Sequence, residues 1–199
     1  MKTIDKIIEH SIDIKKSTFI CTLIPCSNIA DIDDIISYYK SKYHDANHNC
    51  VAYIVASQKR ANDDGEPSKT AGMPMLNVLE KQELSNIIAI VTRYFGGIKL
   101  GAGGLTRAYT QSVVEALNVA QIVSMEPIDC FEITINYNHS KKFEHLCKLH
   151  EIIIENIQYT DQVSYRILIK DHHFFNIIQE LTNNQYQKQF LYETTIAIS

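Results

Sequence analysis

The 199-residue sequence contains no tryptophan, only four prolines and only seven glycines. It also contains no apolar run near the roughly 18 residues that a membrane-spanning helix needs. Its first residues, MKTIDKIIEHSID, are interrupted by charges too often for a secretion signal. We therefore expect a cytoplasmic protein with no membrane partner.

A strong excess of either charge is also missing, since the formal net charge is −4. Residues 1–125 carry 13 Lys and Arg against 13 Asp and Glu, and residues 126–199 carry 6 against 10. This balance argues against a protein that coats nucleic acid through bulk charge, but it leaves a local basic patch open. The five cysteines are scattered and never form a C-x-x-C pair, which is typical of reduced thiols packed as small apolar side chains.

The few glycines are all concentrated between Asn62 and Tyr109, together with two of the four prolines. Glycine permits positive φ and close backbone approach at an entropic cost. This stretch therefore needs positive φ or close backbone approach, which the rest of the chain does not need. We expect the functional site there.

The apolar pattern of the first half predicts a mixed α and β domain. Alternating or nearly continuous apolar residues predict strands over 8–14, 19–24, 50–56 and 87–95. Helical spacing predicts a helix capped by Asn28 and extending to Tyr43, a short helix starting at Met73, and a helix over 105–120. The last helix follows a strand and a glycine-rich loop.

The pattern changes at residues 124–127, where we expect a domain boundary. After it, strands are predicted over 131–137, 151–159, 163–169 and 190–198. Ser140 is a suitable cap for the helix between the first two strands, and His172 and His173 open a helix reaching Leu181. The order βαββαβ is that of the ferredoxin-like unit, so the prediction is an α+β protein with domains 1–125 and 126–199.

The glycine-rich loop and the helix after it have the features of an anion site. Such a loop exposes backbone N–H groups and the positive end of the helix dipole, which attract phosphate or carboxylate. Arg107, in the first turn of the predicted helix, is disfavoured by the dipole unless an anion lies nearby. The predicted site for an anion or nucleic acid contains Arg93, Gly96, Gly97, Lys99, Gly101, Gly103, Gly104 and Arg107.

The turn DDGEP supplies three possible acidic partners of this site, Asp63, Asp64 and Glu66. They could hold a divalent cation, but the alternative is that these acids and the nearby bases pair with one another. Two further candidates have weaker support, a metal set of His44, His48 and Cys50 and a nucleophile among Ser68, Thr70 and Cys50. The loop matches neither a Walker motif nor G-x-G-x-x-G, and we expect no metal or cofactor.

The same residues resemble the IMPACT, or YigZ-like, family. The matching motifs are HNCVAY at 48–53, DDGEP at 63–67, TAGMPML at 70–76 and TRYFGGIKLGAGGLTRAY at 92–109. One departure is Lys69, where the family usually has glycine. The resemblance implies a first domain like domain 2 of ribosomal protein S5, with a left-handed βαβ crossover, and a ferredoxin-like second domain similar to domain V of elongation factor G.

The resemblance also implies a role in translation, because eukaryotic relatives regulate translation initiation through an amino-acid-starvation kinase. The leading hypothesis is therefore a non-catalytic regulator that binds RNA or a ribosome-associated partner through the glycine loop and its basic residues. The main alternative is an enzyme acting on a phosphorylated or carboxylated small molecule, with the DDGEP acids beside an anion cradle. A third is a protein-interaction module that docks through the acidic second domain.

Overall fold

The computed structural model describes residues 1–198 and divides into two compact units. The first contains Met1–Met125 and the described residues from Ala197 on, and the second contains Glu126–Ile196. Ser199, the last residue of the expected second domain, lies outside the described residues. Among the described residues, no helix is long and apolar enough to cross a membrane.

The first unit is built on a five-stranded antiparallel sheet. Its strands are, in spatial order, β2 (Ile8–Ile14), β3 (Ser17–Pro25), β6 (Ile87–Tyr94), β4 (His48–Val55) and β5 (Gln58–Asn62). The central strand β6 is buried over its first seven residues, which accounts for its continuous apolar sequence. The predicted strands over 8–14 and 19–24 are confirmed, and they pair antiparallel as a hairpin with a short turn.

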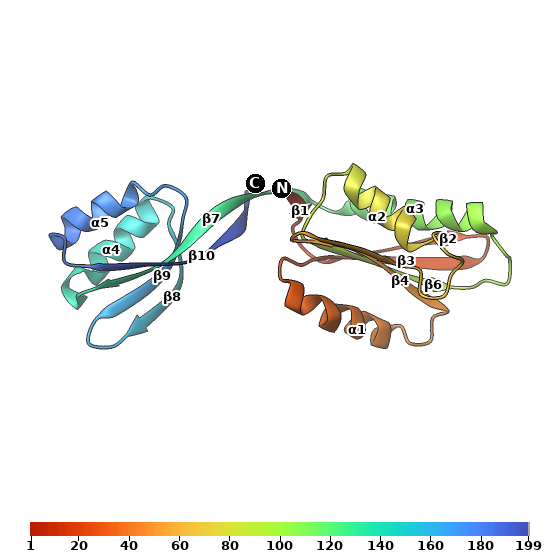
Figure 1. The fold of residues 1–199 in the computed structure, drawn as a ribbon, viewed down its shortest axis with the longest axis horizontal. Helices are drawn as coiled ribbons and strands as arrows, with labels where there is room; N and C mark the ends of the chain where they lie inside the picture. Colours follow the sequence, from red (N-terminus) through yellow and green to blue (C-terminus); the bar gives the residue numbers. More distant parts are fainter. Residues whose placement is uncertain (199) are drawn as a thin grey trace. The chain divides into compact units, whose positions relative to one another are not determined.

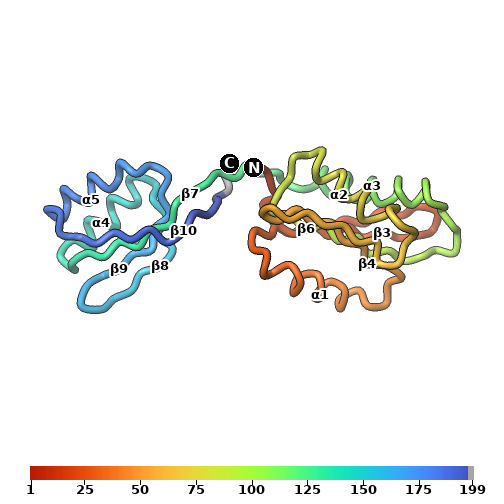
Figure 2. The backbone as a smooth tube through the Cα atoms, viewed as in Figure 1, coloured from red at the N-terminus to blue at the C-terminus, as the bar shows by residue number. Residues whose placement is uncertain are grey.

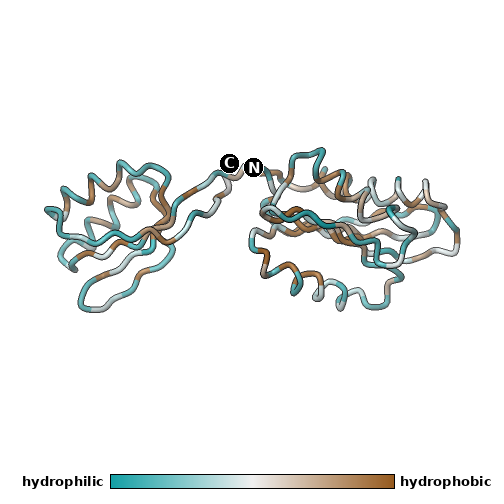
Figure 3. The backbone as a smooth tube through the Cα atoms, in the orientation of Figure 1, coloured by the Kyte–Doolittle hydropathy of each residue, from teal (hydrophilic) through white to brown (hydrophobic). Residues whose placement is uncertain are grey.

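Helices cover both faces of this sheet (Figure 1). One face carries α1 (Ile32–Lys42), and the other carries α2 (Gly72–Lys81) and α3 (Ala102–Val119), which lie beside each other. Figure 3 shows the hydrophobic residues gathered along the strands between these layers. The larger core lies under α2 and α3, with Met75, Leu79 and Tyr109 fully buried.

Two helix starts in this unit differ from the sequence predictions. Asn28 caps a single 3-10 turn, Ile29–Asp31, by accepting a hydrogen bond from the Ala30 amide, and α1 starts only after it. Helix α3 begins at Ala102, three residues before the predicted start, so Gly103 and Gly104 belong to its first turn. Arg107 is consequently its sixth residue and lies in its second turn.

Two short strands carried no sequence signal strong enough to predict them. Strand β1 (Lys2–Ile4) pairs with residues 122–124, and β5 is an edge strand whose side chains are mostly exposed. An exposed edge strand needs no apolar alternation, because neither of its faces is fully buried.

The second unit has the predicted order of elements and one sheet, in which β7 pairs antiparallel with β9 and β9 with β8; Figure 2 traces it along the chain. Strand β7 runs without a break from Ile122 to Ile135 across the boundary between the units. The other elements are α4 (Tyr137–Leu149), β8 (Ile153–Tyr159), β9 (Val163–Ile169), α5 (Phe174–Thr182) and β10 (Gln187–Ile198). One core cluster, with Phe143, Tyr165 and Ile178 fully buried, lies between α4, α5 and the sheet.

The predicted cap of α4 is wrong. The helix begins at Tyr137, which had been placed in the strand, and its N-cap position is Asn136. Ser140 lies inside the helix, where its hydroxyl contacts the Tyr165 hydroxyl at 2.5 Å. A buried tyrosine hydroxyl requires a partner, so the serine that looked like a cap instead satisfies a core tyrosine. All five cysteines are free and buried, as the sequence indicated.

Candidate functional site

A pocket of about 350 Å³ lies beside the glycine-rich loop of the first unit. Three segments form it: the start of β4, the DDGEP turn, and the chain from the end of β6 to the start of α3. The pocket is thus where the two parts of the glycine-rich stretch meet. Its polar lining residues are Asn47, His48, Glu66, Arg93 and Lys99.

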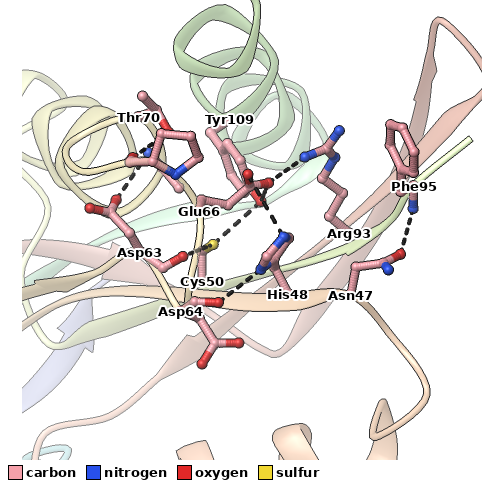
Figure 4. A network of polar contacts seen from close by, with 12 residues as sticks. Asn47, His48, Cys50, Asp63, Asp64, Glu66, Thr70, Arg93, Phe95 and Tyr109 are labelled. Carbon is pink, nitrogen blue, oxygen red and sulfur yellow. Dashed lines mark hydrogen bonds and ion pairs between the residues drawn. The ribbon is translucent and has the colours of Figure 1, made fainter. Parts of the chain in front are cut away.

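A buried ion pair forms the floor of the pocket (Figure 4). The Glu66 carboxylate accepts hydrogen bonds from Arg93 Nη1 at 2.5 Å and from the Tyr109 hydroxyl at 2.8 Å, both at Oε1. The side chains of Glu66 and Arg93 are only 3% and 6% exposed. Burial is costly for either charge alone, so each group depends on the other. Burial raises the pKa of Tyr109, and the neighbouring Cys50 and Glu66 raise it further, which keeps the phenol protonated.

His48 lies between this pair and the DDGEP turn. Its Nδ1 contacts the Asp64 carbonyl oxygen at 2.8 Å, and because a carbonyl only accepts, Nδ1 carries the proton. The other ring nitrogen, Nε2, lies 3.8 Å from Glu66 Oε2. Cys50 lies behind, with its thiol directed to the Asp63 carbonyl and the Tyr109 hydroxyl, and burial raises its pKa to about 12. Such a thiol is not a nucleophile at neutral pH.

The two aspartates of DDGEP do not line the pocket, and their side chains have structural roles. Asp63 accepts hydrogen bonds from the backbone amides of Lys69, Ala71 and Gly72, so it caps the start of α2. Asp64 pairs with Lys40 Nζ at 2.6 Å and accepts the Asn49 amide at 2.6 Å. Of the three predicted acidic partners, Glu66 alone lines the pocket.

The predicted glycines serve the backbone in different ways. Gly97 and Gly101 have φ of +86° and +70°, values that residues with a Cβ rarely adopt. A Cβ on Gly96 would overlap the backbone carbonyl of Lys16 in the β2–β3 turn, so only glycine fits there. Gly103 and Gly104 are the second and third residues of α3, and their amides precede the first bonded amide, that of Leu105. Of these five, only Gly101 lines the pocket.

Four exposed cations lie on the segments that form or adjoin the pocket, and of these four only Lys99 lines it. Lys99 lines the pocket, and Arg107 folds back so that its Nη1 lies 3.7 Å from the Cβ position of Gly103. Lys15 and Lys16 occupy the β2–β3 turn that packs against Gly96. None of these four forms an ion pair with a described residue. The sequence reading missed the two lysines because they are distant in sequence from the glycine loop.

Four charged residues of the predicted site, Asp64, Glu66, Arg93 and Arg107, do not converge on one cleft. Glu66 and Arg93 form a closed pair, Asp64 is held by Lys40, and Arg107 lies outside the pocket lining. Within the described residues, no group of three or more His, Cys, Asp or Glu side chains could hold a metal ion. His44, the first residue of the predicted metal set, hydrogen-bonds instead to the Ser41 carbonyl and forms no such group with His48 and Cys50.

Phe95 adds an exposed aromatic surface to the rim. Its ring is 44% exposed and lies 5.5 Å from the Arg93 guanidinium, and its amide donates to the Asn47 side chain at 2.8 Å. The pocket thus combines an aromatic wall, one free lysine and the uncapped start of an 18-residue helix. This combination suits a ligand with both a flat ring and an anionic group.

Comparison with known proteins gives two matching family models. Residues 15–117 match the Impact N-terminal domain, and residues 133–184 match a domain of unknown function, DUF1949. The first match includes every residue of the pocket.

Relatives match across both units. The IMPACT family member YvyE of Bacillus subtilis (strain 168) is 39% identical over 189 residues, covering 92% of this chain and 87% of the relative. The IMPACT family member YigZ of Escherichia coli (strain K12) is 33% identical over 162 residues and covers 79% of each chain. A solved structure described as a hypothetical protein aligns with a TM-score of 0.71 at 28% identity, over 96% of this chain and 97% of that one.

Proposed function

The chain belongs to the IMPACT family, and we propose that it is a non-catalytic, cytoplasmic regulator linked to translation that binds single-stranded RNA beside its glycine-rich loop. The observation that carries this proposal is a pocket lined by the exposed Phe95 and by Lys99, which pairs with no described residue, with Lys15, Lys16 and Arg107 on adjoining segments. The family resemblance supports the link to translation.

The geometry supports one nucleotide in the pocket and its neighbours along the rim. A base would stack on Phe95, since base stacking on an aromatic side chain is worth about 1–3 kcal/mol and tolerates any sequence. Its phosphate would lie between Lys99 and the free amides at the start of α3. Lys16 and Arg107 would contact the flanking phosphates. The Glu66 charge neutralises Arg93 at the floor, so the attraction for an anion comes from the rim.

The fold assignments are part of the same proposal. We assign residues 1–125 to a fold like domain 2 of ribosomal protein S5 and residues 126–199 to a ferredoxin-like domain similar to domain V of elongation factor G. In support of the second assignment, β7 and β9, the first and third strands of the unit, lie in the middle of the sheet, β8 flanks β9, and β10 pairs with β7. Both folds occur in translation proteins that contact RNA.

The test is binding of a fluorescently labelled single-stranded RNA of ten nucleotides, measured by anisotropy with the full chain. We expect Phe95→Ala to weaken binding by roughly 5- to 100-fold. If Lys99, Arg107 and Lys16 each neutralise one phosphate, affinity should fall about 20-fold between 50 and 200 mM salt, because each contact contributes a slope of roughly −0.7 for a single strand. Lys148→Ala is the matched control, since Lys148 is an exposed lysine of α4 in the second unit.

Two results would contradict the proposal. The first is a chain that fails to retain the RNA at low salt and also fails to sediment with ribosomes. The second is RNA binding that Phe95→Ala and Lys99→Ala leave unchanged, because the RNA would then contact another surface.

A second candidate function is an enzyme or sensor for a small phosphorylated or carboxylated molecule. The observation in its favour is Arg93, whose Nε is buried and has no hydrogen-bond partner among the described residues although the residue lines the pocket. A thermal-shift screen of nucleotides, phosphate esters and amino acids, with and without magnesium, distinguishes this function. A stabilising compound whose effect Lys99→Ala abolishes would favour it over RNA binding.

A further inference from the structure

A second hollow of the first unit lies between the outer surfaces of α2 and α3 and measures about 670 Å³. It shares no lining residue with the pocket at the glycine loop. The two helices lie side by side on one face of the sheet, as Figure 1 shows, and the hollow follows the seam between them. We call it the α2–α3 groove.

The groove has the length of a short docked helix. On α3 its lining residues extend from Thr106 to Val114, eight residues apart on one face. On α2 they extend from Met73 to Gln82, nine residues apart. At 1.5 Å per residue these spans are about 12–14 Å, which equals two to three turns of a helix lying along the seam.

Apolar side chains occur along the length of the groove, and two of them are partly open to solvent. Met73 is 40% exposed and Val114 is 37% exposed, and Val78 lies at the base of the groove. A docked amphipathic helix would cover such exposed apolar side chains with its own apolar face. No aromatic residue lines the groove, and it therefore offers no stacking surface to a nucleic-acid base.

Its charges have a single sign. Lys69 and Lys81 line the groove, and no Asp or Glu does. Neither lysine forms an ion pair with a described residue. Lys69 lies in the loop before α2 and Lys81 in its last turn, so they are placed at opposite ends of the apolar seam. The exposed Arg107 follows Thr106 at the Lys69 end.

We propose that the α2–α3 groove docks an acidic amphipathic helix of a partner protein. Its apolar side chains fill the seam at Met73 and Val114, and carboxylates near its two ends pair with Lys69 and Lys81. Charge complementarity sets this choice, since the groove presents two lysines that pair with no described residue, one before α2 and one in its last turn, with apolar side chains between and beside them. The proposal does not depend on RNA binding, because the two sites use different residues.

The experiment is a selection from a displayed library of random 16-residue peptides on the immobilised full chain. We expect enriched peptides to combine apolar residues at helical spacing with Asp or Glu towards both ends. Anisotropy with the labelled peptides should then show that Met73→Glu and Lys81→Glu each weaken binding roughly tenfold or more, because each places a negative charge against an acidic ligand. Lys148→Glu, the same charge change on an exposed helix of the second unit, should leave the affinity unchanged.

Several outcomes would overturn the proposal. They are a selection without groove-dependent peptides, enrichment of basic or uncharged peptides, and binding that neither groove variant weakens. Sedimentation showing a dimer that Met73→Glu dissociates would assign the groove to a second copy of the chain. Displacement of the peptide by single-stranded RNA would assign it to nucleic acid, whereas loss of RNA binding by Phe95→Ala with peptide binding intact would separate the two sites.

Discussion

Replacing Glu66 by glutamine tests whether the buried ion pair holds the DDGEP turn against the sheet. Glutamine keeps the shape of the side chain and one oxygen that can accept from Tyr109, but it removes the negative charge. The Arg93 guanidinium, with its side chain 6% exposed, then remains buried without a counter-charge. Its Nε has no hydrogen-bond partner among the described residues, so the rings of Phe19 and Phe95, each 5.5 Å from the guanidinium, would be left as its main favourable contacts.

The expected loss in free energy of unfolding is about 3 kcal/mol, the lower end of the range of about 3–5 kcal/mol for breaking a buried pair by removing one partner. Arg93→Met, which leaves the carboxylate unpaired, should lie at the upper end. The double variant removes both charges and should cost at least about 1 kcal/mol less than the sum of the single variants. For a unit of this size, a loss of about 3 kcal/mol lowers Tm by roughly 10 °C.

Urea unfolding of the full chain, followed by far-UV circular dichroism, measures these losses. Since the chain has two compact units, two transitions are expected, and each must be assigned. Phe143→Ala provides the assignment, because Phe143 is fully buried in the core of the second unit. Phe143→Ala should shift the transition of the second unit, and Glu66→Gln should shift the other transition, that of the first unit.

Two results would refute this reasoning. A loss below about 1 kcal/mol for Glu66→Gln would mean that the pair contributes no more than a surface ion pair. Strict additivity in the double variant would mean that the two charges do not depend on each other, and the rim alone would then carry the electrostatics of the pocket.

Three further predictions concern the same stretch and can be measured in the same unfolding assay. Gly96→Ala should destabilise the first unit by more than about 3 kcal/mol, because the added Cβ would overlap the Lys16 backbone. Gly97→Ala should cost only about 1–2 kcal/mol, because its Cβ meets open space and only the positive φ is strained. Equal losses for the two variants would contradict the packing argument. Asp63→Ala should cost about 0.5–2 kcal/mol by removing the cap of α2, and a neutral result would show that the cap is dispensable. Burial raises the pKa of Asp64, but the hydrogen bonds from Lys40 and a backbone amide outweigh it and lower the pKa overall. The resulting stability is fully present above the unfolded-state pKa of about 3.9 and is lost as pH falls through the lower folded-state pKa, so Asp64→Asn should lose less stability than the parent between pH 5 and 2.

The regular elements could be predicted because their apolar periodicity is set by burial on one face. The hairpin from Ile8 to Pro25 and the buried strand β6 are examples. Helix starts were harder to predict, because a cap residue and a helical residue of the same type look alike in sequence. Ser140 was read as a cap, yet it satisfies the Tyr165 hydroxyl, a partner 25 residues away. Such tertiary demands leave no trace in local spacing.

The pocket lies in the stretch where the sequence predicts a functional site, but the sequence does not resolve the roles of its residues. A glycine in a sequence indicates close backbone approach or positive φ, but it does not indicate which segment packs against it. The partner of Gly96 is the turn at Lys16, 80 positions earlier, so the lysines of that turn could not be connected to the loop from sequence. Likewise, DDGEP presents three acids of the same type, and only the fold separates the cap Asp63 and the Lys40 partner Asp64 from Glu66 in the pocket.

The pairing of Glu66 with Arg93 also bears on the proposed binding of an anion by a chain of net charge −4. The pair cancels the charge at the floor of the pocket, whereas Lys15, Lys16, Lys99 and Arg107 form no ion pair with a described residue. Over short distances the local excess decides the potential, because charges beyond about 8 Å are screened at physiological salt. It follows that Glu66→Gln, which frees the Arg93 charge, should strengthen RNA binding in chains that remain folded, and weaker binding by that variant would show that Glu66 itself contacts the ligand.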